Sequence, residues 1–210
     1  MLYRGFFVTI NSMKLILSSL DFHNEKSRQA IIDNIDKPLE ESKLLFIPNE
    51  KADDQRICSN KYYNRLKKLG FTKENIYVFD HKKPENFKNL NIDLIYVGGG
   101  NTFATLQKLR DSGFDKELVR YIKSGVTYIG GSCGAHIVSQ NIEHLLPFDD
   151  NYVNITDFSG LGLVDAIFLV HFDELKFNPG KRREVYKKLL QENKYKVYTL
   201  TNEDTLVVKK

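Results

Sequence analysis

The decapeptide YIGGSCGAHI, residues 128–137, brings a serine, a cysteine and a histidine close together in a frame of glycines. Gly130 to Gly134 match the pattern G-x-S-x-G, in which the serine occupies a strained strand-to-helix turn and small neighbours admit close backbone packing. Free N–H groups at the start of the following helix can stabilise an oxyanion. The pattern also arises where small residues merely let a helix pack on a strand. In this context it favours Ser132 as a nucleophile, with Cys133 as a rival.

A serine nucleophile needs a base, which in turn needs an orienting partner. His136 lies four residues after Ser132 on the same expected helix, but a serine in such a turn points away from its helix. His171 ends the apolar run AIFLV, at the sheet edge where a ligand should lie, so it is the better candidate. His23 and His81 lie in polar segments and are expected at the surface.

A second glycine run, Gly98-Gly99-Gly100, precedes Asn101 and Thr102 at another expected strand-to-helix junction. Successive backbone N–H groups there could form an anion-binding nest. A phosphate loop is a weaker interpretation, because Phe103 stands where G-x-G-x-x-G requires its last glycine and no G-K-[ST] follows. Nucleotide binding is therefore the least favoured function.

Strands and helices alternate along the chain and must position these residues. Strands are expected at 14–19, 43–48, 75–80, 92–100, 126–131 and 166–172, and helices at 24–35, 55–69, 102–110, 115–123 and 181–192. Residues 196–210 are expected to form a closing hairpin whose turn is Asn202-Glu203-Asp204. This alternation predicts an α/β fold, a three-layer doubly wound and mainly parallel sheet. In such sheets the site lies at the carboxyl ends of the strands, where both glycine runs fall.

The bulk composition is that of an ordinary globular protein, with 210 residues, 41% hydrophobic residues and a net charge of +4. Residues 13–210 are expected to form one domain, preceded by a possible N-terminal extension at residues 1–12. The basic residues are dispersed, so no nucleic-acid partner is expected, and no apolar run is long enough to span a membrane. Two cysteines indicate reduced thiols and a cytoplasmic protein. No spacing predicts a metal site, and no cofactor is expected.

Several segments together resemble the peptidase E-like (S51) serine peptidases. They are VGGGNTF, YIGGSCGAH, GLGLVDAIFLVHFDE and LTNEDTLVV, and the resemblance covers roughly residues 13–208. It implies a fold similar to class I glutamine amidotransferases and a Ser-His-Glu triad. Ser132 matches the nucleophile and His171 the base. Glu203 matches the acid, although Asn202 and Asp204 keep that register open.

The resemblance also implies the rest of the site. The oxyanion donors would be backbone N–H groups of Gly99 or Gly100 and of Cys133. Expected substrate contacts are Asn101, Thr102, His136, Asp149 (or Asp150) and Arg182, whose neighbour Arg183 is an alternative. The best-known members cleave dipeptides with an N-terminal aspartate, and an arginine fork suits a carboxylate. Arg182 and Arg183 could equally be a solvated helix face.

The sequence departs from the family at S-C-G-A-H, where S-A-G-A-N is usual, which puts the aspartyl specificity in doubt. The expected function is a serine peptidase acting on short peptides through an acyl-enzyme, as a monomer or homodimer. One alternative is a Cys133-dependent, amidotransferase-like hydrolase. Another is a non-enzymatic protein that binds a small ligand with the same fold.

Overall fold

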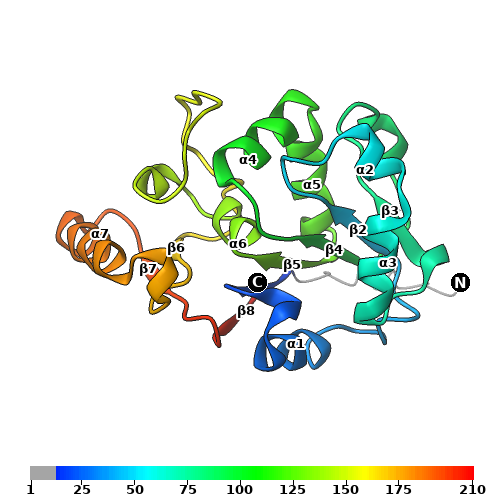
Figure 1. Ribbon diagram of the computed structural model, residues 1–210, viewed down its shortest axis with the longest axis horizontal. Helices are drawn as coiled ribbons and strands as arrows, with labels where there is room; N and C mark the ends of the chain where they lie inside the picture. The colour runs from blue at the N-terminus through cyan, green and yellow to red at the C-terminus, as the bar shows by residue number, and fades with distance from the viewer. Residues whose placement is uncertain (1–12) are drawn as a thin grey trace, which may run out of the picture.

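The computed structural model describes residues 13–210, and the N-terminal extension expected at residues 1–12 lies outside them (Figure 1). The strands are β1 (Lys14–Ser18), β2 (Leu44–Ile47), β3 (Ile76–Val78), β4 (Leu94–Val97), β5 (Thr127–Gly131), β6 (Ile167–Leu169), β7 (Val197–Thr199) and β8 (Thr205–Lys209). The α-helices are α1 (Glu25–Ile32), α2 (Asp54–Cys58), α3 (Asn60–Leu69), α4 (Thr102–Asp111), α5 (Phe114–Lys123), α6 (Cys133–Ile137) and α7 (Pro179–Glu192).

The main sheet has six strands in the order β3-β2-β4-β5-β1-β8. All neighbours in it are parallel except β1 and β8, which are antiparallel. The strands β4, β5 and β1 are therefore adjacent, and their carboxyl ends lie at one edge. Crossover connections of this kind place ligand sites at that edge.

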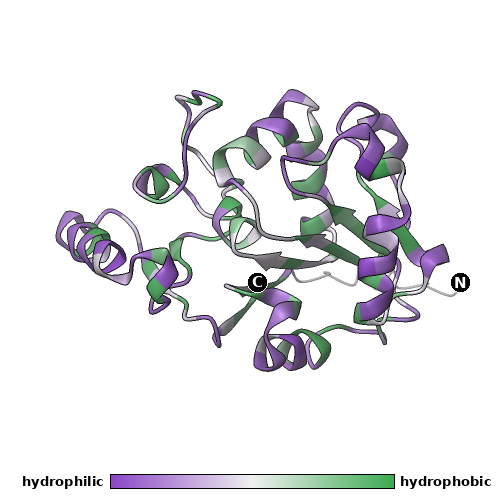
Figure 2. Ribbon diagram, viewed as in Figure 1, coloured by the Kyte–Doolittle hydropathy of each residue, from purple (hydrophilic) through white to green (hydrophobic). Residues whose placement is uncertain are grey.

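Alternate residues of each central strand enter different cores, as a strand buried on both faces requires. In β1, Leu15 and Leu17 pack with side chains of α4 and α5, whereas Ile16 packs with α1 and α3. Hydrophobic residues accordingly concentrate in the strands, and hydrophilic residues on the outer faces of the helices (Figure 2). The predicted three-layer, doubly wound α/β fold is confirmed.

Local stop and start signals explain several helix ends. The Asn24 side chain accepts a hydrogen bond from the Ser27 N–H, 3.2 Å, and caps α1 as expected. Gly70 has φ 115° at the end of α3, a conformation that favours glycine. The single helix expected at 55–69 is two helices, because Ser59 ends α2 and caps α3.

The closing hairpin prediction is wrong. β7 pairs in parallel with β6 to form a separate two-stranded sheet, whereas β8 pairs with β1 at the edge of the main sheet. With α7, this small sheet lies at the end of the molecule away from β3 and α3 (Figure 1). The turn between β7 and β8 therefore connects two sheets, and it carries Asn202 past the carboxyl end of β6.

Within residues 13–210, no helix combines the length and the apolar character that crossing a membrane requires.

Candidate active site

Ser132 lies between β5 and α6 with φ 50° and ψ −106°, a strained conformation for a residue with a side chain. Its N–H donates to the Ser18 carbonyl oxygen of β1, 2.9 Å, so the turn is tied to the neighbouring strand. The Ser132 hydroxyl is thereby held out at the strand ends while α6 begins at Cys133. This is the geometry expected of a nucleophile on a strand-to-helix elbow.

The glycines around Ser132 are required by close contacts. A Cβ atom on Gly131 would lie 1.9 Å from Asp21 Oδ2, and one on Gly134 would lie 2.1 Å from the Val97 carbonyl oxygen. A Cβ on Gly130 would lie 2.6 Å from the Gly134 carbonyl oxygen. Any side chain at these positions would push the elbow away from β4 or from the β1–α1 connection.

His171 follows β6 of the small sheet, and its side chain lies against Ser132, which follows β5 of the main sheet. Its Nε2 lies 3.0 Å from Ser132 Oγ, within hydrogen-bond distance. The ring stacks on Phe177, with centroids 4.0 Å apart, and the His171 N–H donates to Ser19 Oγ, 3.1 Å. Burial is the main cause that lowers the pKa of His171 below its usual value. The imidazole is thus neutral near pH 7, as a base must be.

Asn202 orients the imidazole. Its Oδ1 lies 2.7 Å from His171 Nδ1, and its Nδ2 donates to Glu174 Oε2, 2.5 Å. An ionised carboxylate only accepts hydrogen bonds, so Glu174 determines which end of the Asn202 amide faces His171. Asn202 Oδ1 then accepts the Nδ1–H proton, which leaves the Nε2 lone pair directed at Ser132. A neutral amide backed by a carboxylate thus stands where a carboxylate was expected.

Glu203, the expected acid, does not contact His171 in the structure. Its exposed side chain forms an ion pair with Lys26 of α1. Asp204 also faces away, because its Oδ2 accepts from the Thr201 N–H, 2.7 Å. Of the three residues that the sequence left open, Asn202 is the one that contacts His171 in the structure, because β7 and β8 belong to different sheets.

The backbone of Gly99 and that of Cys133, which were expected to supply oxyanion donors, both lie next to Ser132. A Cβ atom on Gly99 would lie 3.7 Å from Ser132 Cβ, so the β4–α4 turn runs beside the serine. Gly100, by contrast, packs against Asn49 and Glu50, and a Cβ there would lie 2.5 Å from Glu50 Oε2. Between the two glycines left open by the sequence, the geometry favours Gly99.

The Cys133 thiol does not fit the alternative role of nucleophile. It is 1% exposed, belongs to the core, and lies 3.9 Å from the Asn101 carbonyl oxygen. Burial raises the pKa of Cys133 to about 12, so the reactive thiolate is absent near neutral pH. The side chain of Cys133 is therefore part of the core beneath the elbow.

Four of the expected substrate contacts form a hydrogen-bonded group beside the serine, outside the cavity that contains it. Asn101 caps α4 through the Ala104 N–H, 2.9 Å. The Thr102 N–H donates to Asp149 Oδ2, 2.9 Å, and its hydroxyl lies 3.3 Å from His136 Nδ1. His136 is 6% exposed, and burial lowers its pKa well below the usual value. These hydrogen bonds join the β4–α4 turn to α6 and to the loop between α6 and β6.

Arg182 is likewise not placed for substrate binding. It is 6% exposed, its Nε donates to the Val170 carbonyl oxygen, 2.8 Å, and its Nη1 donates to that of Phe177. The guanidinium group lies 4.3 Å from the centroid of the Phe148 ring. Because Phe177 stacks on His171, Arg182 supports the base indirectly, through its contacts with Phe177. The carboxylate-binding role implied for it does not fit these contacts.

A cavity of about 310 Å³ opens in front of Ser132 and His171. Its other lining residues are Ser19, Leu20, Asp21, His23, Phe46, Asn49, Tyr62, Arg65, Gly98 and Gly99. Sequence reasoning missed Asp21 and Arg65 as lining residues. His23 is exposed, as expected, and it also lines the cavity. The segment SSLDFHN begins at the carboxyl end of β1, so the strand-end rule could have indicated Asp21 and His23. No sequence signal marked Arg65.

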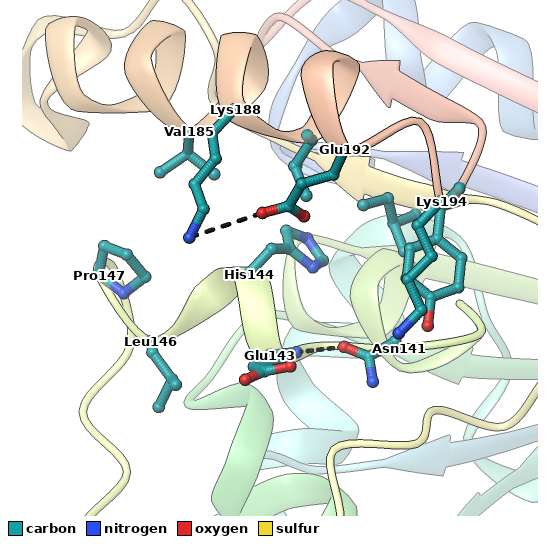
Figure 3. Close-up of a pocket in the computed structure, with 12 residues that line it drawn as sticks. Asn141, Glu143, His144, Leu146, Pro147, Val185, Lys188, Glu192 and Lys194 are labelled. Atoms are coloured by element: carbon teal, nitrogen blue, oxygen red, sulfur yellow. Dashed lines mark hydrogen bonds and ion pairs between the residues drawn. The ribbon is translucent and has the colours of Figure 1, made fainter.

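A second cavity of about 330 Å³ lies between α7 and residues 141–147, and Figure 3 shows its lining. Lys188 and Glu192 extend from α7 above His144 and form an ion pair, 3.6 Å. Neither Ser132 nor His171 lines this cavity. It is therefore separate from the chemistry described above.

Across residues 13–210, no three His, Cys, Asp or Glu side chains gather in an arrangement that could hold a metal ion. The fold and the Ser132–His171 pair define an α/β protein with the geometry of a serine hydrolase.

The family model of peptidase family S51 matches residues 14–210, and the chain belongs to this family. An uncharacterized peptidase from Listeria innocua is 31% identical over 79% of this chain and 80% of its own length. Another, from Listeria monocytogenes, is 36% identical over 56% of this chain but only 57% of its own length. A solved structure of a Listeria monocytogenes protein assigned to peptidase E is 26% identical, with a TM-score of 0.69, and covers 95% of this chain and 98% of its own.

Proposed function

We propose that the chain is a serine peptidase that cleaves short peptides through an acyl-enzyme intermediate. The observation that carries the proposal is the 3.0 Å separation of Ser132 Oγ and His171 Nε2 at a strained elbow that faces a cavity. Family membership supports peptides as the substrate class. A cavity of this volume is at the small end of ligand pockets, which supports short substrates.

The reaction follows from the hydrogen bonds. Ser132 Oγ attacks the carbonyl carbon of the peptide bond while its proton passes to His171 Nε2. The N–H groups of Gly99 and Cys133 bind the oxygen of the tetrahedral intermediate. His171 then gives the proton to the leaving nitrogen as the C–N bond breaks, which leaves an ester on Ser132.

Water completes the cycle. His171 takes a proton from the water molecule that attacks the ester, and the acid product leaves as the serine regains its proton. Asn202 keeps Nδ1 protonated throughout and aligns the ring, and Glu174 holds Asn202. The triad in this proposal is therefore Ser132, His171 and Asn202 in place of the expected Ser-His-Glu.

The test compares Ser132→Ala with Cys133→Ala on a dipeptide library that includes Asp-X and neutral N-terminal residues. Loss of the nucleophile lowers kcat by a factor of about 10⁴ to 10⁶. Cys133→Ala keeps turnover within a few-fold, because only its backbone is used. A fluorophosphonate probe labels Ser132 in the wild type, as located by peptide mass spectrometry. Full hydrolysis by Ser132→Ala would refute the serine mechanism.

Failure of the wild type to label or to hydrolyse any peptide would instead favour the small-ligand-binding alternative. Equal stability of Ser132→Ala and wild type, measured as Tm, shows that the loss is chemical.

A further inference from the structure

Arg65 of α3 lines the same cavity as Ser132 and His171 but takes no part in the proposed bond cleavage. Its Nη2 lies 2.8 Å from His23 Nε2, which belongs to the turn after β1. Since a guanidinium group only donates hydrogen bonds, His23 Nε2 is the acceptor in this contact. The two side chains come from elements on one side of the sheet and converge on the cavity.

No carboxylate within the described residues lies at ion-pair distance from Arg65. Apart from Asp21 and the two histidines, the other residues that line the cavity carry no ionised side chain. Arg65 therefore presents a guanidinium charge at a small cavity without a direct counterion, and a carboxylate or phosphate is the group that best fits its fork of donors.

Asp21 is the one acidic residue among those that line the cavity with Arg65. It is 3% exposed and packs against Gly131, and its Oδ1 has no hydrogen-bond partner among the described residues. Tyr96 experiences the charges of both Asp21 and Arg65. Burial is the main cause that raises the pKa of Asp21, while the neighbouring Tyr96 hydroxyl and the charge of Arg65 oppose the rise. Asp21 thus acts on Arg65 at longer range, and the two side chains form no ion pair.

We infer that Arg65 binds a carboxylate group of the peptide substrate in the cavity beside Ser132. This inference rests on the proposed function and assigns to α3 the role that the family resemblance implied for Arg182. Arg182 is 6% exposed and does not line this cavity, and its Nε and Nη1 already donate to the Val170 and Phe177 carbonyl oxygens. The carboxylate is either the C-terminal group of the peptide or an acidic side chain, and the two sources are separable by experiment.

The experiment measures kcat/KM for Arg65→Gln and Arg65→Lys with two substrate pairs. Ala-Ala is compared with its C-terminal amide, and Asp-Ala-amide is compared with Asn-Ala-amide. A lost charge-assisted hydrogen bond lowers kcat/KM by between about tenfold and about 100-fold, mainly through KM. We expect that loss in Arg65→Gln only for the member of a pair that carries the recognised carboxylate. Arg65→Lys recovers part of it.

The matched control is Arg56→Gln, which removes the same charge from α2, outside the cavity, and leaves all four substrates unchanged. Selective loss on Ala-Ala identifies the C-terminal carboxylate, and selective loss on Asp-Ala-amide identifies the side chain. Equal loss on carboxylate and neutral members, or no loss, overturns the inference.

Fluorophosphonate labelling separates this failure from failure of the proposed function, because the probe carries no carboxylate. Arg65→Gln labels at the wild-type rate if the catalytic groups are intact. If the wild type itself does not label, the proposed function fails and the inference fails with it.

Discussion

The two halves of the candidate site are built in different ways. The elbow around Ser132 is made by consecutive residues between β5 and α6, and its shape follows from glycines that admit no side chain. The half around His171 is assembled from separate segments: β6 supplies the base, the β7–β8 connection supplies Asn202, and the turn after β6 supplies Glu174. The first half is local and sterically determined, whereas the second depends on long-range pairing.

This difference explains which parts of the site were predictable. The pattern of small residues around Ser132 is contained in a single window of five residues, 130–134. The partner of His171 depends on whether β7 pairs with β8 or with β6, and both pairings suit the same residues. A shift of one residue in a turn decides between an exposed Glu203 and an oriented Asn202.

Gly134→Ala is expected to have the largest effect on the local half. The new Cβ would lie 2.1 Å from the backbone oxygen of Val97, which cannot move without breaking β4. Overpacking of this severity destabilises by at least about 3 kcal/mol, and activity is lost with the elbow geometry. Chemical denaturation gives the free energy of unfolding.

The control for Gly134→Ala is Gly180→Ala in the first turn of α7. Its nearest neighbour would be Asn178 Oδ1 at 3.7 Å, so the change is expected to be neutral or slightly stabilising. Similar effects at both glycines would mean that close packing does not define the elbow.

Asn202→Ala is expected to have the next largest effect, now on the long-range half. Without Oδ1 the imidazole loses its orienting partner, and kcat falls by a factor of about 10² to 10⁴, the range spanned by loss of an orienting group in a triad. Steady-state kinetics with a dipeptide substrate give kcat, and circular dichroism verifies the fold. Retention of kcat would show that Phe177 and Ser19 alone hold His171.

The double variant Asn202→Asp/Glu174→Gln sharpens this point through its pH dependence. Glutamine in place of Glu174 can donate to the new carboxylate, which then faces His171 directly. Activity needs neutral His171, whose pKa burial lowers in the wild type, so activity is expected to be lost only below the usual histidine range.

A carboxylate beside the imidazole favours its charged form and raises the pKa of His171. The acid limb of kcat/KM against pH therefore moves upward in the double variant. An unchanged limb would mean that another group than His171 titrates in the free enzyme.

Glu174→Ala compared with Glu203→Ala is expected to give the smallest difference. Without Glu174 the Asn202 amide is free to rotate, and about tenfold is lost from kcat, as for a charge-assisted hydrogen bond. Glu203→Ala breaks only an exposed contact with Lys26, and kcat stays within about twofold. The reverse order of effects would restore Glu203 as the functional acid.

The sequence by itself determined the parts of this protein that depend on neighbours along the chain. Alternating apolar strands and helices predicted the layered α/β fold, and G-x-S-x-G predicted the elbow at Ser132. The position of His171 at the end of an apolar strand predicted the base, and the resemblance to the S51 peptidases agreed with it. These features depend on local periodicity, capping and steric exclusion, which act over a few residues.

Only the tertiary structure decided the rest. It buried Cys133 and Arg182, placed Asn202 and not Glu203 against His171, and brought Arg65 of α3 to the cavity that Ser132 also lines. None of these positions has a local signature, because each depends on which strands pair and which helix face packs on the sheet. Such choices are set by long-range burial and hydrogen bonding, and they appear only when the whole chain is folded.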